Sequence, residues 1–346
     1  MTWFRPFRAP RLALALQGGG AHGAFTWGVL DALLERGITP VAASGASAGA
    51  VNAVALAHGL LDGGVDGARA SLARLWTAIG SHMPEGWFID SDPPGPAPLL
   101  ALWLHWAKLL SPYELNPLGI NPLRQILTDQ IDVPRLRATP GPALFIATTH
   151  AASGRLRLFE RAELSLDAIV ASACLPTLQQ AVMIDGEPYW DGGYAANPPL
   201  TPLVTGSNAD ELMVVTLNPR VHGPLPRTVP EIQARAVEIA FNAAFLREAS
   251  ILVEWQAAAR QSRWLRGPLE RRLAALRLHV IDADDALAGL PGRTRMVAHL
   301  PFLERLRDLG RERLQQWWAE GGRREGNAHT AWFGTSSAGG SSPPAA

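Results

Sequence analysis

One serine of this chain lies between two glycines, in the sequence Gly-Ala-Ser-Ala-Gly at positions 45–49. The G-x-S-x-G spacing is typical of a nucleophile elbow, a sharp turn from a strand into a helix that exposes a serine oxygen for attack on a carbonyl carbon. The pattern also arises by chance in a chain rich in glycine and alanine. Here an apolar, strand-like run precedes it and helical spacing follows it, as an elbow requires. We therefore predict that Ser47 is a nucleophile, whereas the neighbouring Ser44 lacks the flanking glycine pair.

A glycine-rich stretch precedes this motif, with the sequence Gly-Gly-Gly-Ala-His-Gly at positions 18–23. Its G-x-G-x-x-G spacing allows three interpretations: a dinucleotide-binding loop, an oxyanion hole built from backbone N–H groups, or a plain glycine turn. A dinucleotide site expects a carboxylate about 20 residues further on, at the end of the next strand. Positions 38–46 contain none, and Asp31 and Glu35 fall inside the intervening predicted helix. Beside a serine elbow, the stretch favours an oxyanion hole.

A serine hydroxyl needs a base before it can act as a nucleophile. None of the nine histidines lies in a recognisable catalytic loop, although His222 and His299 come late enough in the chain for a conventional triad. More distinctive is Asp191, which is followed by two glycines and then by an Asn-Pro-Pro turn. We interpret Asp191 as the candidate base, and the alternative is an ordinary Asp-Gly hairpin turn.

These motifs, in this order, resemble those of the patatin-like phospholipase family of serine acyl hydrolases, and the resemblance covers roughly residues 12–217. The glycine-rich stretch matches the oxyanion loop of the family, Ser47 its nucleophile, and Asp191 with the following glycine its D-G motif. The sequence Ala-Ser-Ala-Cys-Leu-Pro at positions 171–176 is similar to the small-residue A-S-x-x-x-P segment that precedes the aspartate. His22 departs from the pattern, because the family often has an arginine there.

The resemblance implies a two-step acyl transfer on a lipid ester. Asp191 takes the proton of Ser47, Ser47 attacks the ester carbonyl, and water then releases the acyl group, with no metal and no cofactor. An exposed aspartate has a pKa of about 3.9 and is a weak base at neutral pH, so burial in an apolar pocket should raise its basicity. The implied site residues are the catalytic pair Ser47 and Asp191, the oxyanion residues Gly18, Gly19 and Gly20, and the supporting glycines Gly23, Gly45, Gly49, Gly192 and Gly193.

Two other functions stay open: a non-catalytic lipid-binding or regulatory protein of the same fold, and a nucleotide-binding protein that uses residues 18–23. The presence of both Ser47 and Asp191 disfavours the first, and the missing ribose carboxylate disfavours the second. As a partner we expect a lipid or another acyl ester, and no nucleic acid. The formal net charge is +0, although 18 basic and 12 acidic residues lie between positions 220 and 324. This balance excludes a uniformly basic nucleic-acid binder.

Short apolar runs alternate with helical spacing through the first part of the chain. Residues 12–16, 38–44, 144–148 and 212–217 are predicted strands, and residues 24–36 and 48–58 are predicted helices. Such alternation predicts an α/β fold, with a mostly parallel central sheet flanked by helices in three layers and a helical C-terminal extension.

We expect the chain to divide into three regions. Residues 10–220 form the patatin-like catalytic domain, residues 221–325 are mainly helical, and the Gly/Ser/Pro-rich residues 326–346 form a disordered tail. A proline-rich insertion at about 83–123 interrupts the first region. It contains the apolar segment Leu99–Leu110, which could be a cap over an acyl pocket, an interfacial helix or part of the core.

The composition is that of a globular protein, with 47% hydrophobic and 18% charged residues among 346. The single cysteine, Cys174, excludes an internal disulfide. No segment reaches the ~20 apolar residues of a transmembrane helix, and the apolar run at positions 12–16 is too short for a signal-peptide core. We therefore expect a cytoplasmic protein, with peripheral contact to a membrane through apolar surface such as Leu99–Leu110.

Overall fold

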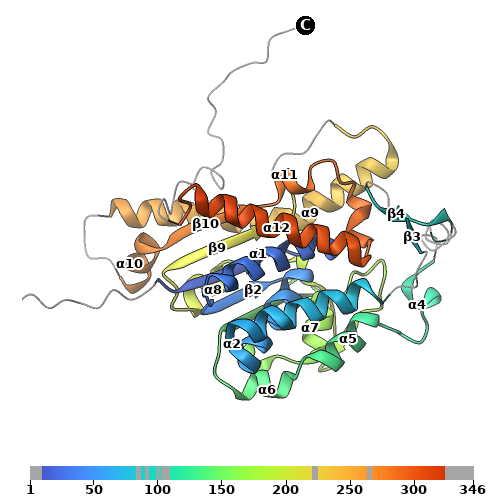
Figure 1. The fold of residues 1–346 in the computed structure, drawn as a ribbon, viewed down its shortest axis with the longest axis horizontal. Coiled ribbons are helices and arrows are strands. Elements are labelled where there is room, and N and C mark those ends of the chain that lie inside the picture. The colour runs from blue at the N-terminus through green and yellow to red at the C-terminus, as the bar shows by residue number, and fades with distance from the viewer. Residues whose placement is uncertain are drawn as a thin grey trace, which may run out of the picture.

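The computed structural model describes residues 10–82, 87–89, 93–98, 100, 102, 110–219, 225–262 and 267–323. Its centre is a sheet with the strand order β10-β9-β1-β2-β5-β8-β7, to which β6 adds by pairing with β5 (Figure 1). The strands from β10 to β5 run parallel, whereas β6, β8 and β7 join antiparallel. The predicted mostly parallel sheet is thus confirmed. The strands are β1 (Leu12–Leu16), β2 (Ala42–Gly45), β3 (Phe88–Ile89), β4 (Gly95–Pro96), β5 (Ala143–His150), β6 (Leu156–Glu160), β7 (Val182–Ile184), β8 (Glu187–Asp191), β9 (Glu211–Thr216) and β10 (Arg277–Asp282).

Helices cover both faces of the sheet. Successive side chains of a strand point to opposite faces, so each strand contributes apolar side chains to a core on each side. Leu12, Leu14 and Leu16 pack into a core with α1, α2, α7 and α12 on one face. Ala13 and Ala15 pack into a second core with α8, α9 and α10 on the other face, which confirms three layers. The helices are α1 (Gly23–Glu35), α2 (Ala48–Gly80), α4 (Pro112–Leu115), α5 (Pro122–Gln130), α6 (Val133–Ala138), α7 (Leu166–Ser172), α8 (Thr201–Gly206), α9 (Val229–Gln261), α10 (Pro268–Ala275), α11 (Asp284–Leu287) and α12 (Leu300–Ala319).

Several elements differ from the predicted ones, and the unpredicted strands β6, β7 and β8 are among them. Three further differences have a physical reason. β2 begins at Ala42 rather than at residue 38, since Pro40 has no N–H to donate to a central strand. α2 continues from Ala48 to Gly80 instead of ending at residue 58, with non-helical backbone at Gly63 and Gly64. The strand β10 was not predicted. Its four central residues are all buried, so it lacks the polar alternation that distinguishes a strand from a buried helix segment.

The C-terminal part of the chain packs against the N-terminal part through both the sheet and the helices. β10 pairs in parallel with β9, and α12 lies along α1. The two helix backbones approach closely at two glycines. A Cβ on Gly28 would lie 1.8 Å from the carbonyl oxygen of Arg307, and a Cβ on Gly310 would lie 2.0 Å from the carbonyl oxygen of Phe25. A larger residue at either position would force the helices apart.

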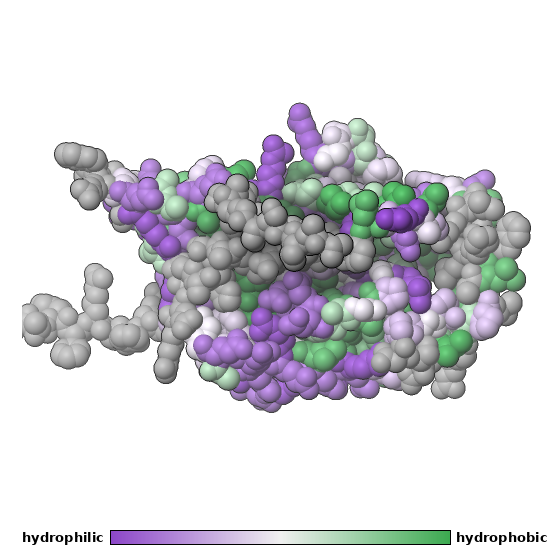
Figure 2. Space-filling view, turned by 90° about the horizontal axis from the view of Figure 1, so that it is seen from above, coloured by the Kyte–Doolittle hydropathy of each residue, from purple (hydrophilic) through white to green (hydrophobic). Residues whose placement is uncertain are grey.

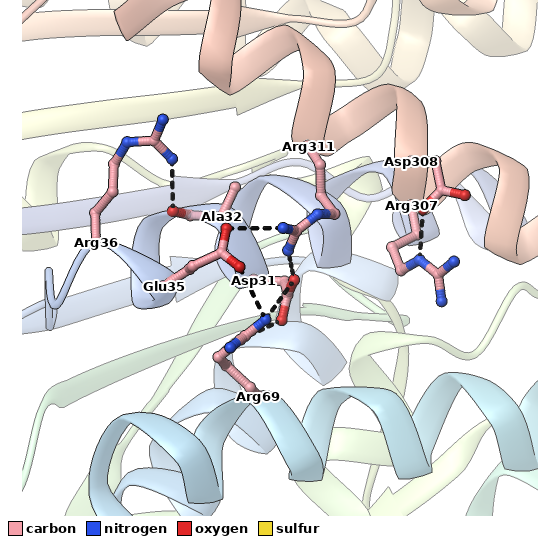
Figure 3. A network of polar contacts seen from close by, with 8 residues as sticks. All are labelled: Asp31, Ala32, Glu35, Arg36, Arg69, Arg307, Asp308 and Arg311. Atoms are coloured by element: carbon pink, nitrogen blue, oxygen red, sulfur yellow. Dashed lines mark hydrogen bonds and ion pairs between the residues drawn. The ribbon is translucent and has the colours of Figure 1, made fainter.

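Ion pairs also link α12 to α1 and α2. Figure 3 shows Arg69 of α2 and Arg311 of α12 converging on Asp31 and Glu35 of α1. Arg69 Nε lies 2.7 Å from Asp31 Oδ1, and Arg311 Nη2 lies 2.7 Å from Glu35 Oε2. Arg311 also pairs with Asp31. The network therefore joins three helices that come from both ends of the chain.

Most of the predicted cap segment Leu99–Leu110 lies outside the described residues, as does the tail from residue 324 onward. Within the segment Leu99–Leu110, the described residue Leu100 is buried, whereas Leu102 and Leu110 are exposed. Its function as a cap, an interfacial helix or core therefore stays a prediction. Among the helices in the described part of the chain, none is long and apolar enough to cross a membrane.

Candidate active site

Ser47 lies on the turn between β2 and α2, at the carboxyl end of the parallel strands. Its backbone φ is 53°, a left-handed conformation that is uncommon for residues other than glycine and that stores strain at functional sites. Its side chain is partly exposed, while Ala46 and Ala48 on either side are buried. The turn has the shape that a nucleophile elbow requires.

Glycines allow this turn to form, because other atoms occupy the space where a Cβ would be. A Cβ on Gly45 would lie 2.4 Å from the carbonyl carbon of Gly49, and a Cβ on Gly49 would lie 2.0 Å from the carbonyl oxygen of Leu16. A Cβ on Gly18 would lie 2.8 Å from the Cβ of Ser47. The glycine-rich loop after β1 therefore passes directly beside the serine.

Asp191 is the last residue of β8 and is completely buried. Its Oδ1 accepts a hydrogen bond from the N–H of Gly193 at 2.8 Å, while Oδ2 has no partner of normal hydrogen-bond geometry among the described residues. Burial raises the pKa of Asp191 to about 7, and the bond from Gly193 together with the nearby Ser47 hydroxyl offsets part of that rise. A carboxyl group that titrates near neutrality beside a serine can accept its proton.

The other predicted glycines make close packing contacts around these two residues. A Cβ on Gly192 would lie 2.1 Å from the carbonyl oxygen of Ala147 in β5. A Cβ on Gly193 would lie 2.5 Å from the ring of Phe241 in α9, and a Cβ on Gly23 would lie 2.6 Å from the Cβ of the first residue of α2. These contacts bring β5, α9 and α2 against the motifs.

One short segment, residues 171–176, contacts both Ser47 and Asp191. The N–H of Ser47 donates to the carbonyl oxygen of Ser172 at 3.0 Å and to its hydroxyl at 3.1 Å. The N–H of Asp191 donates to the carbonyl oxygen of Cys174 at 2.8 Å. Burial, together with the charge of Asp191, raises the pKa of the Cys174 thiol to about 11. The thiol is therefore neutral at pH 7. Through its backbone bonds, the segment fixes Ser47 and Asp191 relative to each other.

Gln17, directly before the glycine-rich loop, is buried and connects the loop to three other segments. Its Oε1 accepts the N–H groups of the two residues that follow β9, at 2.6 and 2.8 Å. Its Nε2 donates to the carbonyl oxygen of Asn197 and to Oδ1 of Asn242 in α9. Asn197 Oδ1 in turn accepts the N–H of Gly18 at 2.6 Å. The N–H of Gly18 is thus already bonded within the protein.

A family model described as patatin-like phospholipase matches residues 14–204. The match covers more than half of the chain and includes the glycine-rich loop, the elbow and Asp191. The chain belongs to the patatin-like phospholipase family. The segment after residue 204 lies outside the match.

Similar curated proteins include uncharacterized NTE family proteins of Mycobacterium tuberculosis (strain ATCC 25618 / H37Rv) and of Mycobacterium bovis. Each is 30% identical in an alignment of 238 residues, and the match covers 65% of this chain and 54% of the relative. The chain thus spans about half the length of these relatives. Among solved structures, VipD from Legionella pneumophila is similar over 90% of this chain and 67% of that chain, with 16% identity and a TM-score of 0.41.

His22, the residue that departs from the patatin-like pattern, binds the part of the chain outside the family match. Its side chain is buried, and its Nε2 lies 2.8 Å from the hydroxyl of Thr294. Burial and the nearby charge of Arg295 lower the pKa of His22 to about 3, so the ring is neutral at physiological pH. An arginine at this position would carry a charge that His22 does not.

Two described histidines, His150 and His299, have partners other than Ser47 and Asp191. His150 at the end of β5 has one ring nitrogen 2.7 Å from Ser153 Oγ and the other 2.9 Å from Glu187 Oε2. His299 packs against the aromatic ring of β3, and His222 lies outside the described residues. In the part of the chain that the structure describes, no hydrogen bond joins a histidine to Ser47 or Asp191.

Sequence analysis did not identify three residues that support the site: Gln17, Asn242 and Thr294. Gln17 offered a signal, since it is a polar residue that ends an apolar strand directly before the glycine-rich loop. Asn242 and Thr294 offered none. Each is a single polar residue more than 200 positions away from the residue that it contacts, Gln17 or His22.

Proposed function

We propose that this protein is a lipid acyl hydrolase in which Ser47 is the nucleophile and Asp191 the general base. The observation that carries the proposal is that a strained, partly exposed serine has its hydroxyl near a completely buried carboxyl group, with both residues bonded to the short segment 171–176. The family membership supports the same class of reaction. A serine ester hydrolase forms an acyl-enzyme and then transfers the acyl group to water.

The environment of Asp191 suits a base that works without a histidine. A carboxyl group with a pKa of about 7 is half ionised at neutral pH and binds a proton much more strongly than an exposed aspartate does. Asp191 would accept the proton of Ser47 as the ester is attacked, return it to the leaving alcohol, and then activate water for deacylation. The bond from Gly193 holds one carboxyl oxygen and leaves Oδ2 for the serine.

Two backbone N–H groups of the glycine-rich loop are the proposed donors to the oxyanion. Gly18 is an unsuitable donor, because its N–H is bonded to Asn197 Oδ1. Gly19 and Gly20 follow it, and Gly20 has a φ of 59°, which turns the chain into a short 3-10 helix. Without side chains, both residues allow a substrate oxygen to approach the backbone closely.

Apolar side chains near Asp191 would hold the acyl chain of a lipid. The rings of Tyr194 and Phe241 lie 4.4 Å apart between centroids, and Phe241 also contacts Gly193. Burial and the charge of Asp191 raise the pKa of Tyr194. Since 38% of Tyr194 is exposed, a substrate can reach this pair from solvent.

We propose that the end of the molecule that carries β3, β4 and α4 contacts aggregated lipid or a membrane surface. Figure 1 places these elements together at its right-hand end, and Figure 2 shows apolar surface toward the same end. Tyr113 joins this end to the site, because its hydroxyl accepts the N–H of Ala181, a few residues from Cys174. The large apolar side chains exposed there are Trp87, Ile89, Tyr113, Leu118 and Ile120.

The two alternative functions have less support. Nucleotide binding would use the N–H groups of the glycine-rich loop for phosphate, yet the N–H of Gly18 is bonded to Asn197. A non-catalytic lipid-binding protein would not need a base with a pKa near neutrality buried beside a strained serine.

Fatty-acid release from a panel of lipids tests the proposal. We expect the purified protein to hydrolyse at least one of a phospholipid, a lysophospholipid, a neutral glyceride and an intracellular polyester, with higher activity on aggregated than on monomeric substrate. Ser47→Ala should abolish this activity. Ser44→Ala is the matched control, because its hydroxyl bonds Pro199 and should matter for stability only. No release by the wild type, or equal release by Ser47→Ala, would contradict the proposal.

A further inference from the structure

The glycine-rich loop is held from its far side by a short segment of the C-terminal region, Gly292–Met296. This segment is a single 3-10 turn, and its Thr294 is completely buried. The hydroxyl of Thr294 lies 2.8 Å from Nε2 of His22, across 272 positions of sequence. His22 also donates its backbone N–H to the carbonyl oxygen of Gly19 at 3.2 Å. His22 therefore forms one hydrogen bond within the glycine-rich loop and one to the C-terminal region.

The hydrogen-bond directions at Thr294 assign the tautomer of His22. The Thr294 hydroxyl donates its single proton to the carbonyl oxygen of Pro291 at 2.8 Å. A carbonyl oxygen can only accept, so the hydroxyl has no proton left for His22. The bond to His22 must therefore run from Nε2–H to Thr294 Oγ1. His22 is a neutral imidazole that carries its proton on Nε2, and its buried Nδ1 has no partner among the described residues.

A second contact in the same segment restrains the neighbouring loop residue. The backbone of Arg295 lies so close to Gly20 that a Cβ on Gly20 would be 2.3 Å from the carbonyl oxygen of Arg295. The guanidinium of Arg295 is itself anchored: it donates to Asn218 Oδ1 at 2.8 Å and lies 3.3 Å from Glu238 Oε1 in α9. Gly20 therefore packs against the backbone of Arg295, whose side chain is bonded to α9 and to a residue just after β9.

We propose that Thr294 is a positioning residue of the oxyanion hole. By accepting the bond from His22 Nε2–H, it holds the turn at residues 19–22 so that the N–H groups of Gly19 and Gly20 face the substrate oxygen. The inference rests on the proposed function, since it assigns a support to the same site. It also assigns part of the oxyanion hole to a segment outside the family match. An oxyanion donor acts only if it is in place before the reaction, and displacement of a reacting group by about 1 Å can cost ~10²-fold in rate.

Three variants, assayed on a short, soluble ester, test this inference. Thr294→Val keeps the shape of the side chain but removes the acceptor, so we expect kcat to fall by roughly 10- to 100-fold while KM changes little. Thr294→Ser keeps the hydroxyl and should retain most of kcat. Thr26→Val is the matched control, because Thr26 is also completely buried but its hydroxyl has no hydrogen-bond partner among the residues that the structure describes. Its kcat should match that of the wild type.

The outcomes separate this inference from the proposed function. A folded Thr294→Val protein with unchanged kcat, or an equal loss of kcat in Thr294→Ser, would overturn the positioning function of Thr294. An inactive wild type whose Ser47 does not react with a fluorophosphonate would instead overturn the proposed function. If Thr294→Val does not fold, the ¹⁵N NMR spectrum of wild-type imidazole groups decides. It should show His22 as the Nε2–H tautomer at pH 7, and an Nδ1–H tautomer would contradict the inference.

Discussion

The segment that matches the family model and the segment that follows it contribute different things to the site. Residues 14–204 contain Ser47, Asp191 and the glycine-rich loop, which are all the groups proposed to react or to bind the oxyanion. The following segment contains none of these groups, but it supplies β9 and β10 of the sheet, α9 beside Gly193, and Thr294 behind the loop. In the proposed mechanism, the first segment carries the chemistry and the second holds its parts in place.

The difference follows from how each kind of contact is encoded. A strained serine or a backbone donor needs particular residues within a few positions, so it produces a local motif. A contact that only supports the glycine-rich loop or a neighbouring helix needs a single polar or small residue. Such contacts form wherever the fold brings two segments together, so they leave no local motif. The Gln17 and Thr294 bonds and the close helix approach at Gly310 are examples.

The largest expected effect comes from Asp191 in the first segment. Asp191→Asn keeps the size of the side chain and can still accept the bond from Gly193, but it cannot take a proton from Ser47. Turnover of a soluble ester should therefore fall by at least ~10²-fold. The matched control is Asp185→Asn, in the exposed turn between β7 and β8, where asparagine also tolerates the positive φ of 52°.

The fold of the Asp191→Asn variant can be checked by thermal melting at pH 8. Burial raises the folded pKa of Asp191 above its unfolded value, so the ionised group costs stability, fully above about pH 7 and not at all below the unfolded pKa. The variant should therefore melt no lower than the wild type. Retained turnover in Asp191→Asn, with loss in a folded His222→Ala or His299→Ala, would instead favour a conventional triad.

The pH dependence of kcat/KM also tests the contribution of the first segment, because it reports the pKa that the surroundings of Asp191 give to its carboxyl group. The ionised carboxylate is the active base, and its fraction falls tenfold for each pH unit below the pKa. With a pKa of about 7, kcat/KM should be level near pH 8 and fall by roughly 100-fold at pH 5. A profile that stays flat from pH 8 to pH 5 would contradict a base of this kind.

A smaller effect tests the attachment of the second segment to the first. Gly310→Ala would place a Cβ 2.0 Å from the carbonyl oxygen of Phe25, and α12 would have to move away from α1. We expect the free energy of unfolding, measured in urea, to fall by about 1–3 kcal/mol. The control is Gly63→Ala, whose Cβ would meet nothing within 4 Å. Equal stability of the Gly310→Ala protein and the wild type would mean that the two segments are not tightly joined.

The sequence predicted the parts of the fold and site that depend on local patterns. β1 is observed over the predicted residues, and α1 differs by one residue at each end. The turn at Ser47 and the burial of Asp191 agree with the expectations drawn from the motifs. β10 was missed because a strand buried on both faces has no alternating pattern, and the end of α2 was missed because paired glycines bent the helix without ending it. Bonds such as His22 to Thr294 could not be predicted, because no local pattern relates residues so distant in sequence.

The most direct test of the central claim is labelling with a fluorophosphonate, which reacts with an activated serine and mimics the tetrahedral intermediate. After reaction at pH 8, peptide mass spectrometry identifies the modified residue. The account predicts modification of Ser47 and of no other serine, with slower labelling of Asp191→Asn under the same conditions. Modification of a different residue while Ser47 stays unmodified would contradict the assignment of Ser47 and Asp191 as the catalytic pair.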